Sequence, residues 1–191
     1  MSDLPSRTEM EHFTEELNML SLYLEDTGYD NEILDPSDEV PVPMLAIDLE
    51  GEDAAQITAY YMYVATGDSW DREDAEEDED DVFGQTAYLQ AIVSFPIGEI
   101  TDEDMLNIFL FCSAATHQLP LGSLFITGEK QLAYRNVFAV DKSIGLTREV
   151  FLETLFVIQY ITRQVMGAVT PLLSGEVDFD EAIERFLVPQ T

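Results

Sequence analysis

Apolar residues near the start of the chain recur at three- and four-residue steps: Met10, Phe13, Leu17, Leu20 and Leu24. This spacing places them on one face of an α-helix. Ser6 and Glu9 form a capping-box pattern at the start of that helix, and Gly28 is suited to end it in a left-handed conformation. The sequence therefore predicts one amphipathic helix that opens the fold.

The segments 44–50, 56–66 and 85–96 alternate between apolar and polar positions with the period of two that is typical of β-strands. In 56–66 both alternating sets contain apolar or aromatic residues, so both faces of that strand should be at least partly covered. Pro96 should end the third strand, because proline cannot donate to a ladder. Residues 29–43 carry three prolines among acidic residues and are predicted to be mostly connection.

The second half of the chain predicts two more strands and three more helices. The segments are a helix over 101–118, strands over 124–127 and 131–140, a long helix from Thr147 towards Val169, and a short helix over 178–186. A turn at 128–130 joins the two strands into a hairpin. Thr101 and Thr147 are suited to cap their helices, and Pro171 and Gly175 to close the long one.

Two of these helices carry more apolar surface than one sheet face needs. The first is apolar around most of its circumference: Met105, Leu106, Ile108, Phe109, Leu110, Phe111, Ala114 and Ala115. A helix of this kind is buried between layers or against a partner. In the long helix, Phe156, Val157 and Tyr160 widen an apolar stripe that runs from Phe151 to Val169. The excess indicates either a thick core or an interaction surface.

The order of elements predicts the fold class. It reads α-β-β-β-α-β-β-α with a final short helix, and strands joined by short turns favour an antiparallel sheet. We expect an α+β two-layer domain with about five strands and helices on one side, over residues 6–173. Residues 174–191 form a short helical extension, and the acidic block 68–81 enlarges a hairpin loop. A chain of 191 residues fits one domain of this kind.

The strong negative charge of the chain limits the kinds of partner that we expect. The chain has 39 Asp and Glu against eight Lys and Arg, for a net charge of −31. Such a surface repels phosphate backbones and anionic lipid heads, so we expect no nucleic acid and no membrane as partner, and favour a basic protein or peptide. Solubility alone, or a high-salt cytoplasm, explains the charge equally well. No secretory signal occupies residues 1–10 and no run is long enough to span a membrane, so a cytoplasmic protein is expected.

Candidate chemistry is sparse. The two histidines, His12 and His117, and the single Cys112 lack the spacing of zinc ligands. Cys112 and His117 are five residues apart on one helix and fall on different faces, and Cys112 lies in an apolar run typical of a buried, inert thiol. Glycine-rich phosphate loops are also absent from the sequence. We therefore expect no catalytic residue, no cofactor and no metal.

The acidic block 68–81 is the one segment with a composition that attracts cations. It has no glycine at the sharp turn that an EF-hand loop requires. A solvated, self-repelling loop is the ordinary interpretation, and weak divalent-cation binding is the alternative. Trp70 lies inside the block, where it could anchor a basic peptide or pack back on the sheet.

Four segments carry a family resemblance: 27–29 at the end of the first helix, 45–51 entering a three-stranded meander, 132–140, and 145–151 opening the long helix. In these segments and in the order of its elements the chain resembles the YbjN-type domain, a family with the type III secretion chaperone-like fold. The resemblance implies a cytoplasmic protein without catalytic residues, often homodimeric, whose relatives bind polypeptides or have regulatory roles. The acidic insertion and the C-terminal helix depart from the family pattern.

These observations favour a non-enzymatic protein-binding module, chaperone-like or regulatory, that self-associates as a homodimer through its apolar helices. The candidate partner-binding residues are Trp70, Phe109, Phe156 and Tyr160. The alternative is a regulatory domain that binds a small molecule or a divalent cation in a cleft between sheet and helices, to which Tyr60, Tyr61 and Tyr63 could contribute. An enzyme with an unrecognised carboxylate site has no positive feature in the sequence.

Overall fold

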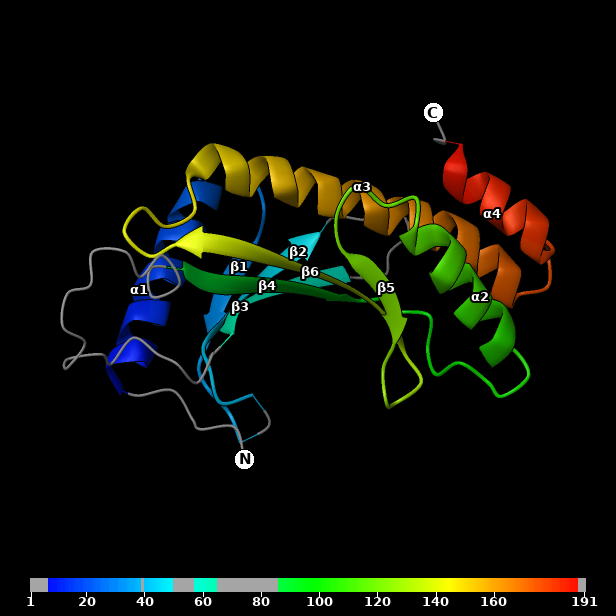
Figure 1. Ribbon diagram of the computed structural model, residues 1–191, viewed down its shortest axis with the longest axis horizontal. Coiled ribbons are helices and arrows are strands. Elements are labelled where there is room, and N and C mark those ends of the chain that lie inside the picture. Colours follow the sequence, from blue (N-terminus) through cyan, green and yellow to red (C-terminus); the bar gives the residue numbers. More distant parts are fainter. Residues whose placement is uncertain (1–6, 39, 50–56, 65–85, 189–191) are drawn as a thin grey trace. The chain divides into compact units, whose positions relative to one another are not determined.

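The computed structural model describes residues 7–38, 40–49, 57–64 and 86–188. Within them the chain forms an α+β fold with an open antiparallel sheet (Figure 1). The helices are α1 (Arg7–Leu24), α2 (Met105–Thr116), α3 (Arg148–Leu173) and α4 (Phe179–Leu187). The strands are β1 (Asn31–Leu34), β2 (Met44–Leu49), β3 (Ile57–Val64), β4 (Thr86–Ser94), β5 (Ser123–Ile126) and β6 (Leu132–Asp141).

The strand order in the sheet is β1-β2-β3-β4-β6-β5. β1 pairs with β2 in antiparallel register, with Asn31 opposite Ile47. β5 pairs with β6 in the same sense, with Ile126 opposite Leu132. The hairpin predicted around 128–130 is therefore confirmed, and so is the antiparallel α+β class.

Packing divides the chain into two compact units. Unit 1 comprises Met1–Asp48, Tyr60–Ala91 and Val137–Leu152, and unit 2 comprises Leu49–Ala59, Ile92–Asn136 and Glu153–Thr191. β3, β4, β6 and α3 therefore each contribute residues to both units.

The core of unit 1 forms around the apolar stripe of α1. Four residues predicted for that stripe are fully buried: Phe13, Leu17, Leu20 and Leu24. Phe13 stacks on Tyr63 of β3 with ring centroids 5.0 Å apart, and Tyr61 meets Phe151 edge-on at 5.4 Å. Aromatic pairs in these geometries add to the free energy that area burial provides. Tyr61 and Tyr63 lie on the same side of β3, as the alternating pattern of the sequence predicts.

Glu16 connects α1 with two other parts of unit 1. Its carboxylate accepts a hydrogen bond from Tyr63, and burial together with this negative neighbour raises the pKa of Tyr63 well above its usual value. A Cβ placed on Gly145 would lie 2.7 Å from the Glu16 Oε2 atom. Gly145 has a φ of 71°, so this close approach suits a glycine on both counts.

The described residues form six strands, where the sequence predicts about five. Residues 31–34 lie in the stretch expected to be connection, yet they form β1 at one end of the strand order. Three of the four side chains in β1 are half-buried and the fourth is exposed, so no buried-exposed alternation marks the strand. The backbone pairing with β2 defines this strand, and side-chain patterns do not report such pairing.

The capping and helix-ending residues predicted from the sequence can be compared with the observed helix ends. Asp178 caps α4 as predicted, because its side chain accepts a hydrogen bond from the Glu181 N–H at 2.9 Å. Gly175, with a φ of 73°, follows the end of α3 as predicted. Pro171, however, lies inside α3, which continues to Leu173. Proline lacks a backbone donor, so it costs the helix one hydrogen bond. The helix continues for only two residues beyond Pro171.

The helix predicted from Thr101 begins later, at Met105. Residues 102–104 form a turn in front of it. The Thr101 hydroxyl accepts a hydrogen bond from the Asp104 N–H at 3.2 Å and donates one to the Asp104 carboxylate at 2.6 Å. These two hydrogen bonds organise the turn before α2.

Gly122 directly precedes β5 and is closely packed. Its φ is 68°, and a Cβ built on it would lie 2.5 Å from the Arg135 carbonyl oxygen and 2.5 Å from the Tyr134 hydroxyl. That hydroxyl donates to the Leu121 carbonyl at 3.1 Å. Burial raises the pKa of Tyr134 to about 12, so the donor keeps its proton through the neutral range.

We predict that Gly122→Ala lowers the free energy of unfolding by about 1–3 kcal/mol, because it combines left-handed strain with an overpacked contact. Urea unfolding monitored by circular dichroism measures this change. Gly128→Ala is the matched control: no described atom lies within 4 Å of its Cβ position. Equal stability of the two variants would contradict the tight packing at Gly122.

Candidate interaction surface

Helix α2 carries no charged residue over its twelve positions. Ile108, Phe111, Cys112 and Ala115 are buried and form its inner face. Leu106, Phe109 and Leu110 point the other way and are 66%, 62% and 44% exposed. We refer to these three residues as the outer α2 face. Their i, i+3, i+4 spacing makes them neighbours on one side of the helix.

The inner face accounts for the contacts of α2 within unit 2. The helix packs against β5 and α4. The Thr116 hydroxyl accepts a hydrogen bond from the Leu124 N–H of β5 at 3.0 Å, and Phe111 meets Phe186 of α4 edge-on at 5.7 Å. Of the two alternatives for this helix, enclosure between layers does not hold for its outer side, where the described residues leave an apolar face exposed; burial against a partner stays a prediction.

The outer α2 face is large enough to contribute to binding. Burying a fully exposed Leu or Phe side chain stabilises a complex by about 1.5–3 kcal/mol. The three side chains are roughly half to two-thirds exposed, so part of that free energy is still available to a partner. Exposed apolar groups gathered in one place on a protein surface mark interaction sites more often than scattered ones do.

Of the four predicted partner-binding residues, three lie on two different helices and the fourth is not described. Phe109 belongs to the outer α2 face. Phe156 and Tyr160 are exposed, four residues apart on α3, and therefore share one side of that helix. Trp70 lies outside the described residues, as does the acidic block 68–81.

Sequence reasoning singled out Phe109 but missed its two neighbours. Leu106 and Leu110 stand three residues before it and one after it, inside the apolar run of α2. That run contains no polar side that would show which residues face the core. The helical spacing around Phe109 was the available signal, and it became decisive only once the buried face was known.

Cys112 is buried, as predicted. Burial raises the pKa of its thiol to about 12. The thiolate is the reactive form of cysteine, so a pKa this high suppresses nucleophilic chemistry near neutral pH. His117 is the C-terminal cap residue of α2 and is exposed.

The tyrosines considered for a ligand cleft divide between two sides of β3. Tyr61 and Tyr63 are fully buried and fill the core of unit 1 through their aromatic contacts. Tyr60 is half-buried on the alternate side of the strand. Aromatic packing thus accounts for the positions of Tyr61 and Tyr63.

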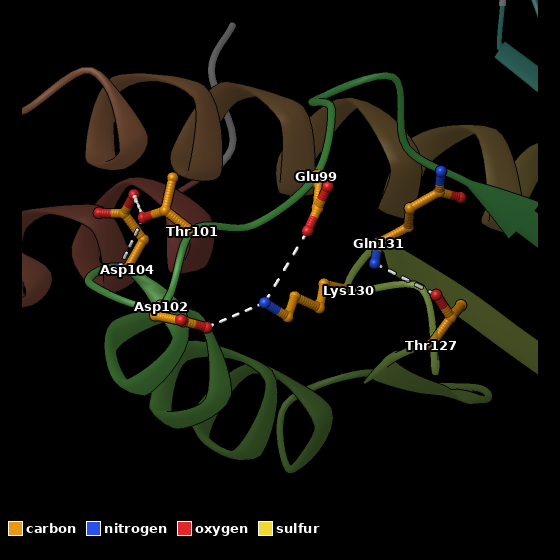
Figure 2. A network of polar contacts seen from close by, with 7 residues as sticks. All are labelled: Glu99, Thr101, Asp102, Asp104, Thr127, Lys130 and Gln131. Carbon is orange, nitrogen blue, oxygen red and sulfur yellow. Dashed lines mark hydrogen bonds and ion pairs between the residues drawn. The ribbon is translucent and has the colours of Figure 1, made fainter.

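A polar network holds the turn before α2 against the β5–β6 hairpin (Figure 2). Lys130 lies 2.9 Å from the Asp102 carboxylate and 3.8 Å from that of Glu99. The hydrogen bond to Asp102, and then the two negative charges, raise the pKa of Lys130. The Gln131 N–H donates to the Thr127 hydroxyl at 3.1 Å and tightens the same hairpin turn. The network therefore positions the start of α2 relative to the hairpin.

Two further properties concern the described residues alone. They contain no group of three or more His, Cys, Asp or Glu side chains that could hold a metal ion. None of their helices has both the length and the apolar character needed to cross a membrane.

No protein-family model matches the sequence, and no curated protein matches it significantly. The resemblance to the YbjN-type domain therefore stays a prediction.

We predict that a thiol reagent labels Cys112 at least roughly 100-fold more slowly in the folded chain than in the unfolded chain at about pH 8, because burial moves its pKa far above the unperturbed value near 8.5. The rate should rise with pH towards the native pKa. Ellman's reagent with and without guanidinium measures both states, and the chain has no other cysteine to interfere. Fast labelling of the folded chain would contradict the burial of this face.

Proposed function

We propose that the chain is a non-enzymatic protein-binding module, chaperone-like or regulatory, that self-associates through the outer α2 face. The observation that carries the proposal is the exposure of Leu106, Phe109 and Leu110 on a helix without charge. These residues offer apolar area to a partner and present no nucleophile or acid–base pair to a substrate.

The lack of charge on the outer α2 face suits contact with a second copy of the chain. Each copy carries a net charge of −31, so two copies repel one another unless their contact surfaces lack acidic groups. A twofold interface places the same patch of each copy against that of the other, and any acid near the axis meets its own equivalent. The three residues of the outer α2 face carry no charge, and the acids that precede them, Asp102 and Glu103, lie in the turn before the helix.

The family resemblance supports the same proposal. YbjN-type domains are often homodimeric, and their relatives bind polypeptides or have regulatory roles. A type III secretion chaperone-like fold and a cytoplasmic location are part of the proposal. The exposed Phe156 and Tyr160 of α3 supply a second apolar area for a polypeptide, and the acidic exterior would attract basic segments in particular.

We predict that the chain sediments as a dimer at high micromolar concentration and that Phe109→Glu weakens the dimer roughly 100-fold or more. The substitution would bury an unpaired carboxylate against an apolar partner. Analytical ultracentrifugation over a concentration series measures the dissociation constant.

Leu22→Glu is the matched control for this experiment. Leu22 is 54% exposed on α1, against 62% for Phe109, so both variants place one more acid on an exposed helix position. The Leu22 variant should dimerise like the original chain. Both variants should keep the original unfolding midpoint at concentrations where every chain is monomeric, because dimerisation itself raises the midpoint. A chain that is monomeric throughout, or a Phe109→Glu variant that still dimerises, would disprove self-association through this face.

A further inference from the structure

Helix α4 rests on α2 through a narrow apolar side. Figure 1 shows α4 beside α2, and the two helices pack together. Phe186 contacts the ring of Phe111 edge-on at 5.7 Å. One turn earlier Ala182 is completely buried, so the buried side of α4 has a small residue followed four positions later by an aromatic one.

Contacts within its own segment favour the helical form of α4. Asp178 caps its first turn, and Asp180 and Glu181 lie at the positive end of the helix dipole. Arg185 in the last turn pairs with Glu181 at 2.9 Å. The α3–α4 connection passes through Gly175, which takes a left-handed conformation. A turn at this glycine leaves α4 joined to α3 by a short connection and not by a continuous helix.

The charge of α4 is unfavourable for its position. Asp180, Glu181 and Glu184 are exposed on its polar side, in a chain whose net charge is already −31. Like charges raise the free energy of the compact state. A helix with the same apolar side and a basic polar side would contact the same face without this repulsion.

We propose that the inner α2 face around Phe111 is a helix-binding surface that α4 occupies in the free protein, and that a basic amphipathic helix with the same small-aromatic spacing displaces α4. The partner is a polypeptide segment whose lysines or arginines lie opposite its buried alanine and phenylalanine. This site is on the opposite side of α2 from the self-association face, so it does not depend on dimerisation.

If α4 competes with the external helix, the effect of a substitution on the affinity for that helix has a predictable direction. When a site is open only part of the time, the apparent affinity for a ligand falls in proportion to the open fraction. A substitution that loosens α4 therefore strengthens binding of the external helix. A substitution that damages the binding face on α2 weakens it.

The test uses the full chain and a fluorescent peptide with the 178–187 sequence carrying Asp180→Lys, Glu181→Lys and Glu184→Lys. A scrambled peptide of identical composition, in which alanine and phenylalanine are no longer four apart, is its control. Fluorescence anisotropy should show the patterned peptide binding roughly tenfold or more tightly than the scrambled one, because only the first can present its apolar side. Equal affinities would reduce the interaction to charge and overturn the proposal.

Chain variants then locate the site. Phe186→Ala should raise the affinity for the patterned peptide roughly tenfold, because it opens the site. Leu187→Ala, at an exposed position of the same helix, should leave it unchanged, and Phe111→Ala should lower it roughly tenfold. An unchanged or lower affinity in a folded Phe186→Ala chain would overturn the proposal.

Two controls keep these results specific. Far-UV circular dichroism and the unfolding midpoint must show that the Phe186→Ala and Leu187→Ala chains are folded, so the decisive comparison does not require the Phe111 variant to fold. Phe109→Glu should not weaken the patterned peptide by more than about twofold, because it acts on the opposite face. Loss of binding in that variant would assign the peptide to the outer α2 face and overturn the proposal.

Discussion

Electrostatic self-repulsion is the constraint on which the rest of the structure depends. With 39 acidic and eight basic side chains, ion pairing cannot neutralise the surface, and apolar burial has to supply the stability. The described core follows this rule, because its buried polar side chains are Asn136, Thr154 and Thr162, with no carboxylate among them. The exposed acids of the described residues are screened by water and salt.

In such an acidic chain, a helix without charge indicates a surface that can be covered by other groups without burying a carboxylate. α2 serves unit 2 through its inner face, which meets β5 and α4, while its outer face remains apolar and exposed. The two proposals use these two faces separately: a second copy on the outer face, and a basic helix in place of α4 on the inner one. Neither interaction brings further acids together.

The sequence is most predictive where periodicity and burial coincide. The stripe from Phe13 to Leu24, the alternation of β3 and the β5–β6 hairpin all follow from side-chain patterns that report which face is buried. β1 escaped prediction because backbone pairing with β2, and not a side-chain pattern, defines it. Only part of the candidate surface could be predicted. The apolar run around Phe109 was evident from the sequence, but the sequence of a helix that is apolar on both sides does not show which side the core covers.

The hydrogen bond from the Leu124 N–H to the Thr116 hydroxyl also affects how the sheet can grow. β5 is the last strand at its end of the sheet, and α2 supplies a side-chain partner where another strand would have to pair. Strand addition is thereby obstructed at this edge, as in other proteins that protect sheet edges from aggregation. A fibre needs two accepting edges on every subunit, whereas pairing through one edge ends with two molecules. The Thr116 contact therefore removes one free backbone donor from the edge at which a further strand would pair.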